Sequence, residues 1–108
     1  MPARTQTDSD RLGLACAVLE QRGWLVRPNL AVLYDAPPAG GPRSVAWLAK
    51  SAAKALDAEG RWLVQPLSVH WEGTDSDKRE LMAVFVHCGL QVRTTTGSGH
   101  ILRLVPGR

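Results

Sequence analysis

The sequence predicts an α/β fold of two layers with the element order αβαβαββ: a small mixed four-stranded sheet with helices packed on it and a C-terminal β-hairpin. Three observations indicate this fold. Helical segments end at glycines, extended apolar segments begin directly after them, and the last two extended segments lie too close together for a crossover. A chain of 108 residues has room for one core. We therefore expect a flexible N-terminus over residues 1–8 and a single compact domain over residues 9–108.

Apolar spacing and capping residues predict three helices. They are expected over residues 9–22, 44–58 and 78–88. In the first and third, apolar residues recur at the i, i+3, i+4 and i+7 spacing of a buried stripe. The second follows the structure-breaking stretch APPAGGP, with Ser44 as its candidate N-cap. Asp77 and Glu80 can form a capping box at the start of the third.

Extended segments between the helices predict four strands. They are expected over residues 24–34, 61–70, 90–96 and 100–105. Gly23, Gly60 and Gly89 precede the first three, where a helix would end in a left-handed residue. Pro28 and Pro66 lack a backbone donor, so we expect a bend, a bulge or an edge at each. Strands separated by a helix favour parallel right-handed crossovers, whereas the last two must form an antiparallel hairpin.

A repeated phrase joins helix ends to strands in two places. The stretch QRGWLVRPNLAVLY at 21–34 and the stretch EGRWLVQPLSVHW at 59–71 share Trp-Leu-Val, a proline and a later apolar pair. Duplication and convergent helix-to-strand chemistry both account for the repeat. Trp24 and Trp62 begin the two phrases and are expected in the core, whereas Trp47 and Trp71 are candidates for stacking on bases.

The closing hairpin has a register that the turn decides. A three-residue turn at 97–99 places Arg93 opposite Arg103 and Val92 opposite Leu104. One face is then apolar, and the other carries both arginines. A two-residue turn would mix the two faces, so we predict the longer turn. Two opposed arginines repel unless an anion or a carboxylate lies between them.

The excess of positive charge lies in this hairpin. The formal net charge is +3, and residues 1–89 contain as many basic as acidic side chains. The excess therefore comes from Arg93, Arg103 and Arg108. Charge concentrated in one place attracts polyanions, whereas mixed charge mainly confers solubility.

A second basic feature lies in the predicted middle helix. Arg43, Trp47, Lys50 and Lys54 are spaced by four, three and four residues, which places them on one helix face. This face is either a solvated surface or a stripe that follows phosphates, with helix N-terminal amides as further donors.

Several classes of protein are disfavoured. Cys16 and Cys88 have neither redox nor zinc spacing and are expected to be buried thiols. His70 and His87 lack metalloprotease spacing, so we expect no metal site and no cofactor. The longest apolar run, LMAVFVHCGL, is too short to span a bilayer, and the N-terminus has no signal-peptide core, so we expect a cytoplasmic protein with no membrane partner.

The order of elements resembles that of nucleic-acid-binding families. The stretch DKRELMAVFVHCGLQVRTTTGSGHILRLVP is similar to the closing helix, strand and hairpin of the CRM (YhbY-type) RNA-binding domain, and DAPPAGGPRSVAWLAKSAAKALDAEG occupies the place of its glycine loop and second helix. Alba chromatin proteins and the C-terminal domain of bacterial translation initiation factor 3 share that topology. The usual GxxG loop is absent here, with only Gly40 and Gly41 present. The resemblance implies nucleic-acid contacts around Gly40 to Arg43 and around Arg93 to Arg103.

The C-terminal third also resembles HicA-type mRNA-cleaving toxins. There a helix, a glycine, an arginine-bearing strand and Gly-Ser-His precede another strand. In this chain Gly99 follows Gly97-Ser98, and His100 comes one position later. The resemblance implies acid–base chemistry for His100, and the shifted histidine and the missing closing helix depart from the pattern.

The favoured hypothesis is a small nucleic-acid-binding protein, with RNA ahead of DNA, that uses the basic hairpin and the basic helix face. One alternative is a protein-interaction subunit or homodimer that offers an edge strand. Another is a HicA-like RNase with a displaced histidine. The predicted nucleic-acid contacts are Arg43, Trp47, Lys50, Lys54, Arg93, Thr95, Ser98, His100 and Arg103.

Overall fold

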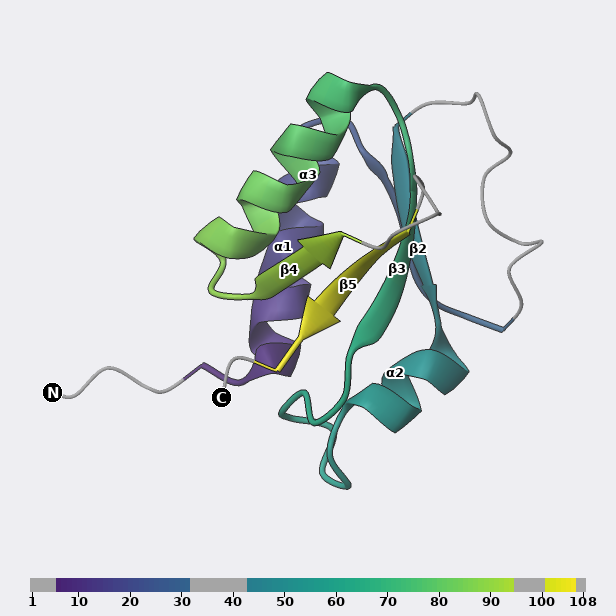
Figure 1. Ribbon diagram of the computed structural model, residues 1–108, viewed down its shortest axis with the longest axis vertical. Helices are drawn as coiled ribbons and strands as arrows, with labels where there is room; N and C mark the ends of the chain where they lie inside the picture. Colours follow the sequence, from purple (N-terminus) through teal and green to yellow (C-terminus); the bar gives the residue numbers. More distant parts are fainter. Residues whose placement is uncertain (1–5, 32–42, 95–100, 107–108) are drawn as a thin grey trace, which may run out of the picture.

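The computed structural model describes residues 6–31, 43–94 and 101–106 as three helices and a five-stranded mixed sheet (Figure 1). In chain order the elements are α1 (Asp8–Gln21), β1 (Leu25–Leu30), β2 (Ser44–Leu48), α2 (Ala49–Ala55), β3 (Leu67–Glu72), α3 (Asp75–His87), β4 (Gln91–Thr94) and β5 (Ile101–Val105). The predicted α/β class with its C-terminal hairpin is confirmed. The sheet has five strands rather than four, so the order among the described residues is αββαβαββ.

The additional strand, β2, changes the topology of the sheet. The strand order is β1-β2-β3-β5-β4, in which β1 and β2 are parallel and the other three pairs are antiparallel. We expected the first two predicted strands to be parallel. Instead, β2 lies between β1 and β3, and β3 runs against both. The parallel crossover predicted through the middle helix is therefore wrong.

Residues 44–48 form a strand and not the first turns of a helix. Ser44, Val45, Ala46 and Trp47 are all buried, because β2 is a central strand with neighbours on both sides. A strand buried on both faces shows no alternation, so a short apolar run of this kind is easily mistaken for buried helix. Helix α2 begins at Ala49, with Leu48 as an N-cap that makes no side-chain bond, so Ser44 is not its cap.

The predicted strand at 61–70 begins later than expected. β3 starts at Leu67, directly after Pro66, which can donate no ladder bond. Trp62 therefore does not begin a strand. It is half-buried, and the guanidinium of Arg11 lies 6.0 Å from its ring centroid.

The two long helices begin with the same tetrapeptide. Thr7 caps α1 and Thr74 caps α3, each in a capping box with the aspartate three residues later, Asp10 or Asp77. The predicted box between Asp77 and Glu80 is therefore wrong: Asp77 is the acidic partner of Thr74, and α3 begins at Asp75, earlier than predicted. After each helix the chain turns at a glycine with positive φ, 88° at Gly23 and 92° at Gly89, as predicted.

One face of the sheet is covered by α1 and α3, which lie side by side (Figure 1). The inward residues of the central strands are fully buried against them. They include Val45, Leu67, Val69, Leu102 and Leu104. α2 packs at the end of the sheet where β2 finishes and β3 begins. The opposite face of the sheet has none of these three helices over it.

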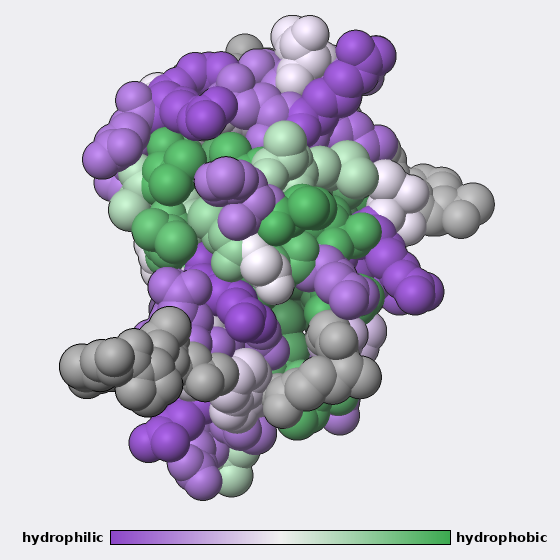
Figure 2. Space-filling view, turned by 90° about the vertical axis from the view of Figure 1, so that its left-hand side faces the viewer, coloured by the Kyte–Doolittle hydropathy of each residue, from purple (hydrophilic) through white to green (hydrophobic). Residues whose placement is uncertain are grey.

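The outer side of the helix layer is partly apolar. Leu14 on α1 is 45% exposed and Val86 on α3 is 60% exposed. Figure 2 looks onto this side and shows hydrophobic residues gathered in its upper half, bordered by hydrophilic ones.

Candidate nucleic-acid interface

The face of the sheet away from α1 and α3, here called the open face, carries exposed cations on β1, β4 and β5, whereas the β2 residues on this face, Ser44 and Ala46, are buried. Residues paired across neighbouring strands point to the same face. The first row of paired residues crosses four strands and consists of Arg27, Ala46, His70 and Ile101. The next row crosses three strands and consists of Ser68, Arg103 and Arg93.

Arg93 and Arg103 occupy opposite positions on β4 and β5, as the predicted register requires. The pairs Val92–Leu104 and Thr94–Leu102 confirm the same register. Leu102 and Leu104 are fully buried on the helix side, which leaves both arginines exposed on the open face. Among the described residues, no acidic side chain forms an ion pair with either arginine.

Arg27 adds a third exposed cation to this face, and the sequence interpretation missed it. It lies on β1, beside the partly buried Val26 that packs against the core. This alternation between an inward valine and an outward arginine was visible in the sequence. Its meaning depended on the neighbour of β1, which is β2, a strand that was not predicted.

His70 and Ser68 lie among the arginines on β3. Both are half-buried, and burial lowers the pKa of His70, so its ring is neutral near pH 7. A neutral imidazole and a hydroxyl can each donate a hydrogen bond to an anion. The open face therefore combines charged and neutral donors.

Negative charge is sparse on this face. Of the described strand residues that point this way, Glu72 is acidic, at the end of β3 opposite Ser44. Glu72 is four residues from Ser68, about 13 Å along an extended strand. The potential at the Arg93–Arg103 pair is therefore not neutralised locally by an acid on the strands.

The predicted basic stripe of Arg43, Trp47, Lys50 and Lys54 is not formed as one helix face. Trp47 lies in β2 with 4% of its surface exposed. Arg43 precedes β2 at the end of that strand away from α2. Lys50 and Lys54 are exposed one turn apart on α2, so these two residues do share a helix face, as predicted.

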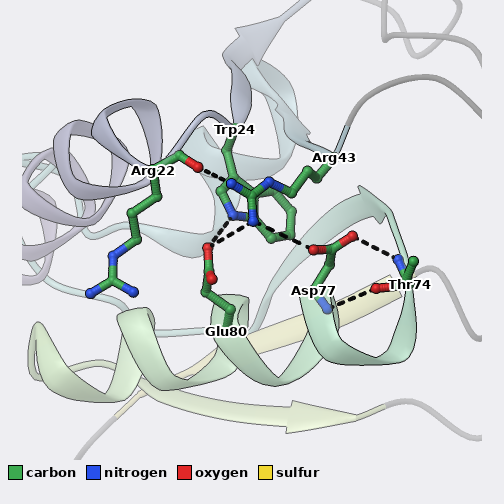
Figure 3. Close-up of polar contacts among 6 residues, drawn as sticks. All are labelled: Arg22, Trp24, Arg43, Thr74, Asp77 and Glu80. Atoms are coloured by element: carbon green, nitrogen blue, oxygen red, sulfur yellow. Dashed lines mark hydrogen bonds and ion pairs between the residues drawn. The ribbon is translucent and has the colours of Figure 1, made fainter.

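Arg43 lies in a polar cluster between the end of α1, the start of β2 and α3 (Figure 3). Its Nη1 lies 3.3 Å from Glu80 Oε1 and 3.5 Å from Asp77 Oδ1. Its Nη2 donates to the carbonyl oxygen of Arg22 at the end of α1, and its guanidinium lies 5.7 Å from the ring centroid of Trp24. Arg43 therefore joins three elements rather than facing an open surface.

The acidic members of this cluster have further partners. Glu80 Oε1 also accepts a 2.8 Å hydrogen bond from Trp24 Nε1. The backbone amide of Thr74 donates to the Asp77 carboxylate and, with smaller help from Arg43, holds the pKa of Asp77 below its ordinary value. The cluster thus sets one guanidinium against two carboxylates, and each of these ions is held by more than one contact.

Three of the tryptophans are too deeply buried to stack on bases. Trp24, Trp47 and Trp71 are each 4% exposed, so the expectation that Trp47 and Trp71 stack on bases is wrong. Trp24 lies in the core as predicted.

Three predicted contacts, Thr95, Ser98 and His100, lie outside the described residues, so the hypothesis of acid–base chemistry at His100 stays a prediction. Within the described ranges, no cluster of three His, Cys, Asp or Glu side chains could hold a metal ion. No helix in that part of the chain is long and apolar enough to cross a membrane. Burial, with a smaller effect of Glu20, raises the pKa of Cys16 to about 11, and burial also raises that of Cys88.

The chain matches no protein-family model, no curated protein and no solved structure. The resemblances noted in the sequence therefore remain expectations.

Proposed function

We propose that the protein binds nucleic acid, RNA ahead of DNA, on the open face of its sheet. The observation that carries the proposal is the Arg93–Arg103 pair: two exposed guanidinium groups opposite one another, with no acidic partner among the described residues. Like charges opposed across two strands are destabilising, and a phosphate between them relieves the repulsion.

The spread of the cations favours an extended anion over a small one. Arg27 on β1 and Arg93 on β4 lie on the two edge strands of the sheet. Five strands at ordinary spacing span about 19 Å. A single phosphate can reach the Arg93–Arg103 pair but not Arg27 as well, whereas a polynucleotide can contact both. Lys50 and Lys54 on α2, at the end of the sheet near Ser68, offer further contacts.

The shape of the face favours RNA over the major groove of DNA. Proteins that read the DNA major groove commonly place a helix among the base edges. Here α1 and α3 cover the opposite face of the sheet from the open face (Figure 1). A broad sheet surface suits the wide, shallow minor groove of RNA or the backbone of a single strand. No tryptophan among the described residues is exposed on the open face. We therefore expect the protein to contact mainly phosphate and ribose and to have a weak sequence preference.

Fluorescence anisotropy tests the proposal with labelled single-stranded RNA, double-stranded RNA and double-stranded DNA over a range of salt concentrations. Wild type should bind RNA. For a single strand, the slope of log K against log salt concentration should be about −0.7 for each phosphate contact. The variant Arg93→Ala/Arg103→Ala should bind RNA of every sequence more weakly, and its slope of log K against log salt should be smaller in magnitude by about 1.4.

A matched control has the same change in net charge on other surfaces. Arg61→Ala/Arg79→Ala removes two exposed arginines, one in the loop before β3 and one on α3. This control should keep the wild-type slope. If both double variants lose affinity equally, the interaction depends on net charge and not on the open face. Absence of binding by wild type at low salt would overturn the proposal.

A further inference from the structure

The two edges of the sheet differ in their capacity to pair with another strand. On the β1 edge, Pro28 has no backbone donor, Asn29 has a φ of 58°, and the register with β2 shifts between Arg27 and Leu30. Proline and bulges of this kind protect an edge strand. The β4 edge, over its described residues, has neither a proline nor a bulge. Its four residues pair in regular register with β5, and no described strand lies on its other side.

An apolar strip accompanies the β4 edge. The side of α3 that faces α1 lines a groove through Glu80, Ala83 and His87. Met82 and Val86 are one turn apart on the opposite flank of α3, the helix that packs against β4. Val86 is 60% exposed, and the half-buried Met82 and Val92 pack against the core. Backbone groups of β4 that no described strand pairs therefore lie next to apolar side chains.

We infer that this edge pairs with the β4 edge of a second copy of the chain, antiparallel, about a two-fold axis at Val92. The register follows from charge. An axis at Val92 sets Val92 against itself on the helix side and sets Gln91 opposite Arg93 of the second copy on the open face. Two side-chain amides then meet two guanidinium groups. An axis at Arg93 would instead oppose two like charges, which is destabilising.

A symmetric pair satisfies both features of the edge at once. The contact is isologous, so each copy supplies the same strand and the same helix flank. The strands satisfy each other's unpaired N–H and C=O groups, and Val86 of one copy is covered by the helix flank of the other. The two open faces then form one continuous surface, with an Arg93–Arg103 pair on each side of the two-fold axis.

Substitutions at Gln91 test the register without touching the core, because this side chain is exposed. Sedimentation equilibrium should show a wild-type monomer–dimer equilibrium. Gln91→Glu, which places a carboxylate opposite Arg93 of the second copy, should tighten the dimer about three- to tenfold at low salt, and Gln91→Arg should weaken it by a similar factor. If the two variants shift the equilibrium in the same direction, the register is wrong.

A second pair of variants locates the surface. Val86→Lys should weaken the dimer by about tenfold or more, since it places a charge on the flank of α3 that the second copy covers in the dimer. Leu14→Lys makes the same change at an exposed residue of α1 and should leave the dimer unchanged. Circular dichroism and urea midpoints check that all four variants are folded.

Two outcomes would overturn the inference. One is a wild type that stays monomeric through the micromolar to millimolar range. The other is a dimer that Leu14→Lys weakens as much as Val86→Lys, which would move the contact to the groove between α1 and α3. Neither outcome bears on RNA binding, which the anisotropy experiment measures separately.

Discussion

Arg93 and Arg103 are direct partners across an antiparallel strand pair, and both guanidinium groups are exposed on the open face. Two like charges at this separation lower the stability of the hairpin. A protein that keeps such a pair has a surface that an anion can stabilise.

Relief of this repulsion should stabilise the free protein. Arg93→Thr removes one charge and introduces a residue with good strand propensity, so we expect the free energy of unfolding to rise by about 0.2–1 kcal/mol at low salt. The rise should shrink as added salt screens the charges. Urea unfolding of wild type and variant at two ionic strengths measures it.

Gln91→Thr is the control, because it makes a similar change of strand propensity on the same exposed face of β4 without removing a charge. The explanation fails if Gln91→Thr stabilises as much as Arg93→Thr. It also fails if the gain from Arg93→Thr does not depend on salt.

Arg43 should act in folding rather than in binding. Arg43→Met leaves Glu80 and Asp77 without their cation and the end of α1 without a donor, so we expect a loss of about 1–3 kcal/mol in the free energy of unfolding. RNA affinity of the folded variant should stay at the wild-type value. Chemical denaturation and anisotropy on the same sample check both.

Arg61→Met is the matched comparison for Arg43→Met. Arg61 pairs with Glu59 at 3.5 Å, but both side chains are largely exposed, so the loss should be at most about 1 kcal/mol. If Arg43→Met reduces RNA affinity as much as Arg93→Ala does, Arg43 takes part in RNA binding and the prediction is wrong.

The stability of the protein should fall on mild acidification because of His70. Burial holds the pKa of His70 below its ordinary value of 6.5, so the unfolded chain takes up a proton at a higher pH than the folded chain does. The free energy of unfolding should therefore decrease as pH falls from about 7 toward about 5. Urea midpoints at successive pH values measure the decrease.

His70→Gln should flatten this pH dependence. The pKa values of Asp57 and Asp77 also lie below their ordinary values, and their stabilisation is lost at lower pH, as they take up protons. The comparison is therefore made above about pH 5. An unchanged pH profile in His70→Gln would contradict the assignment.

Two glycines should respond oppositely to alanine. Gly13 lies inside α1 with no atom within 4 Å of an added Cβ, so Gly13→Ala should stabilise the protein by about 0.5–1 kcal/mol. Gly89 has a φ of 92°, and an added Cβ would lie 3.0 Å from Arg11 Nε. Gly89→Ala should therefore destabilise by about 1 kcal/mol or more. Thermal unfolding of the two variants gives the signs, and a stabilising Gly89→Ala would show that the turn after α3 does not need a left-handed residue.

The sequence by itself determined the features that depend on nearby residues. Helices α1 and α3, the glycines that end them and the register of the β4–β5 hairpin were all predicted, because caps, apolar spacing and turn length act over a few residues. The Arg93–Arg103 pair belongs to this group, since only a short turn separates the two strands.

Tertiary structure decided what depends on partners distant in the chain. β2 is buried on both faces, so its sequence carries no alternation that distinguishes it from helix, and only its neighbours β1 and β3 make it a strand. The same packing encloses Trp47 and joins Arg43 to Glu80, 37 residues away. It also brings Arg27 and His70 into one row on the open face. Local residue preferences cannot specify such pairings, because their free energy arises only when distant segments meet and exclude water.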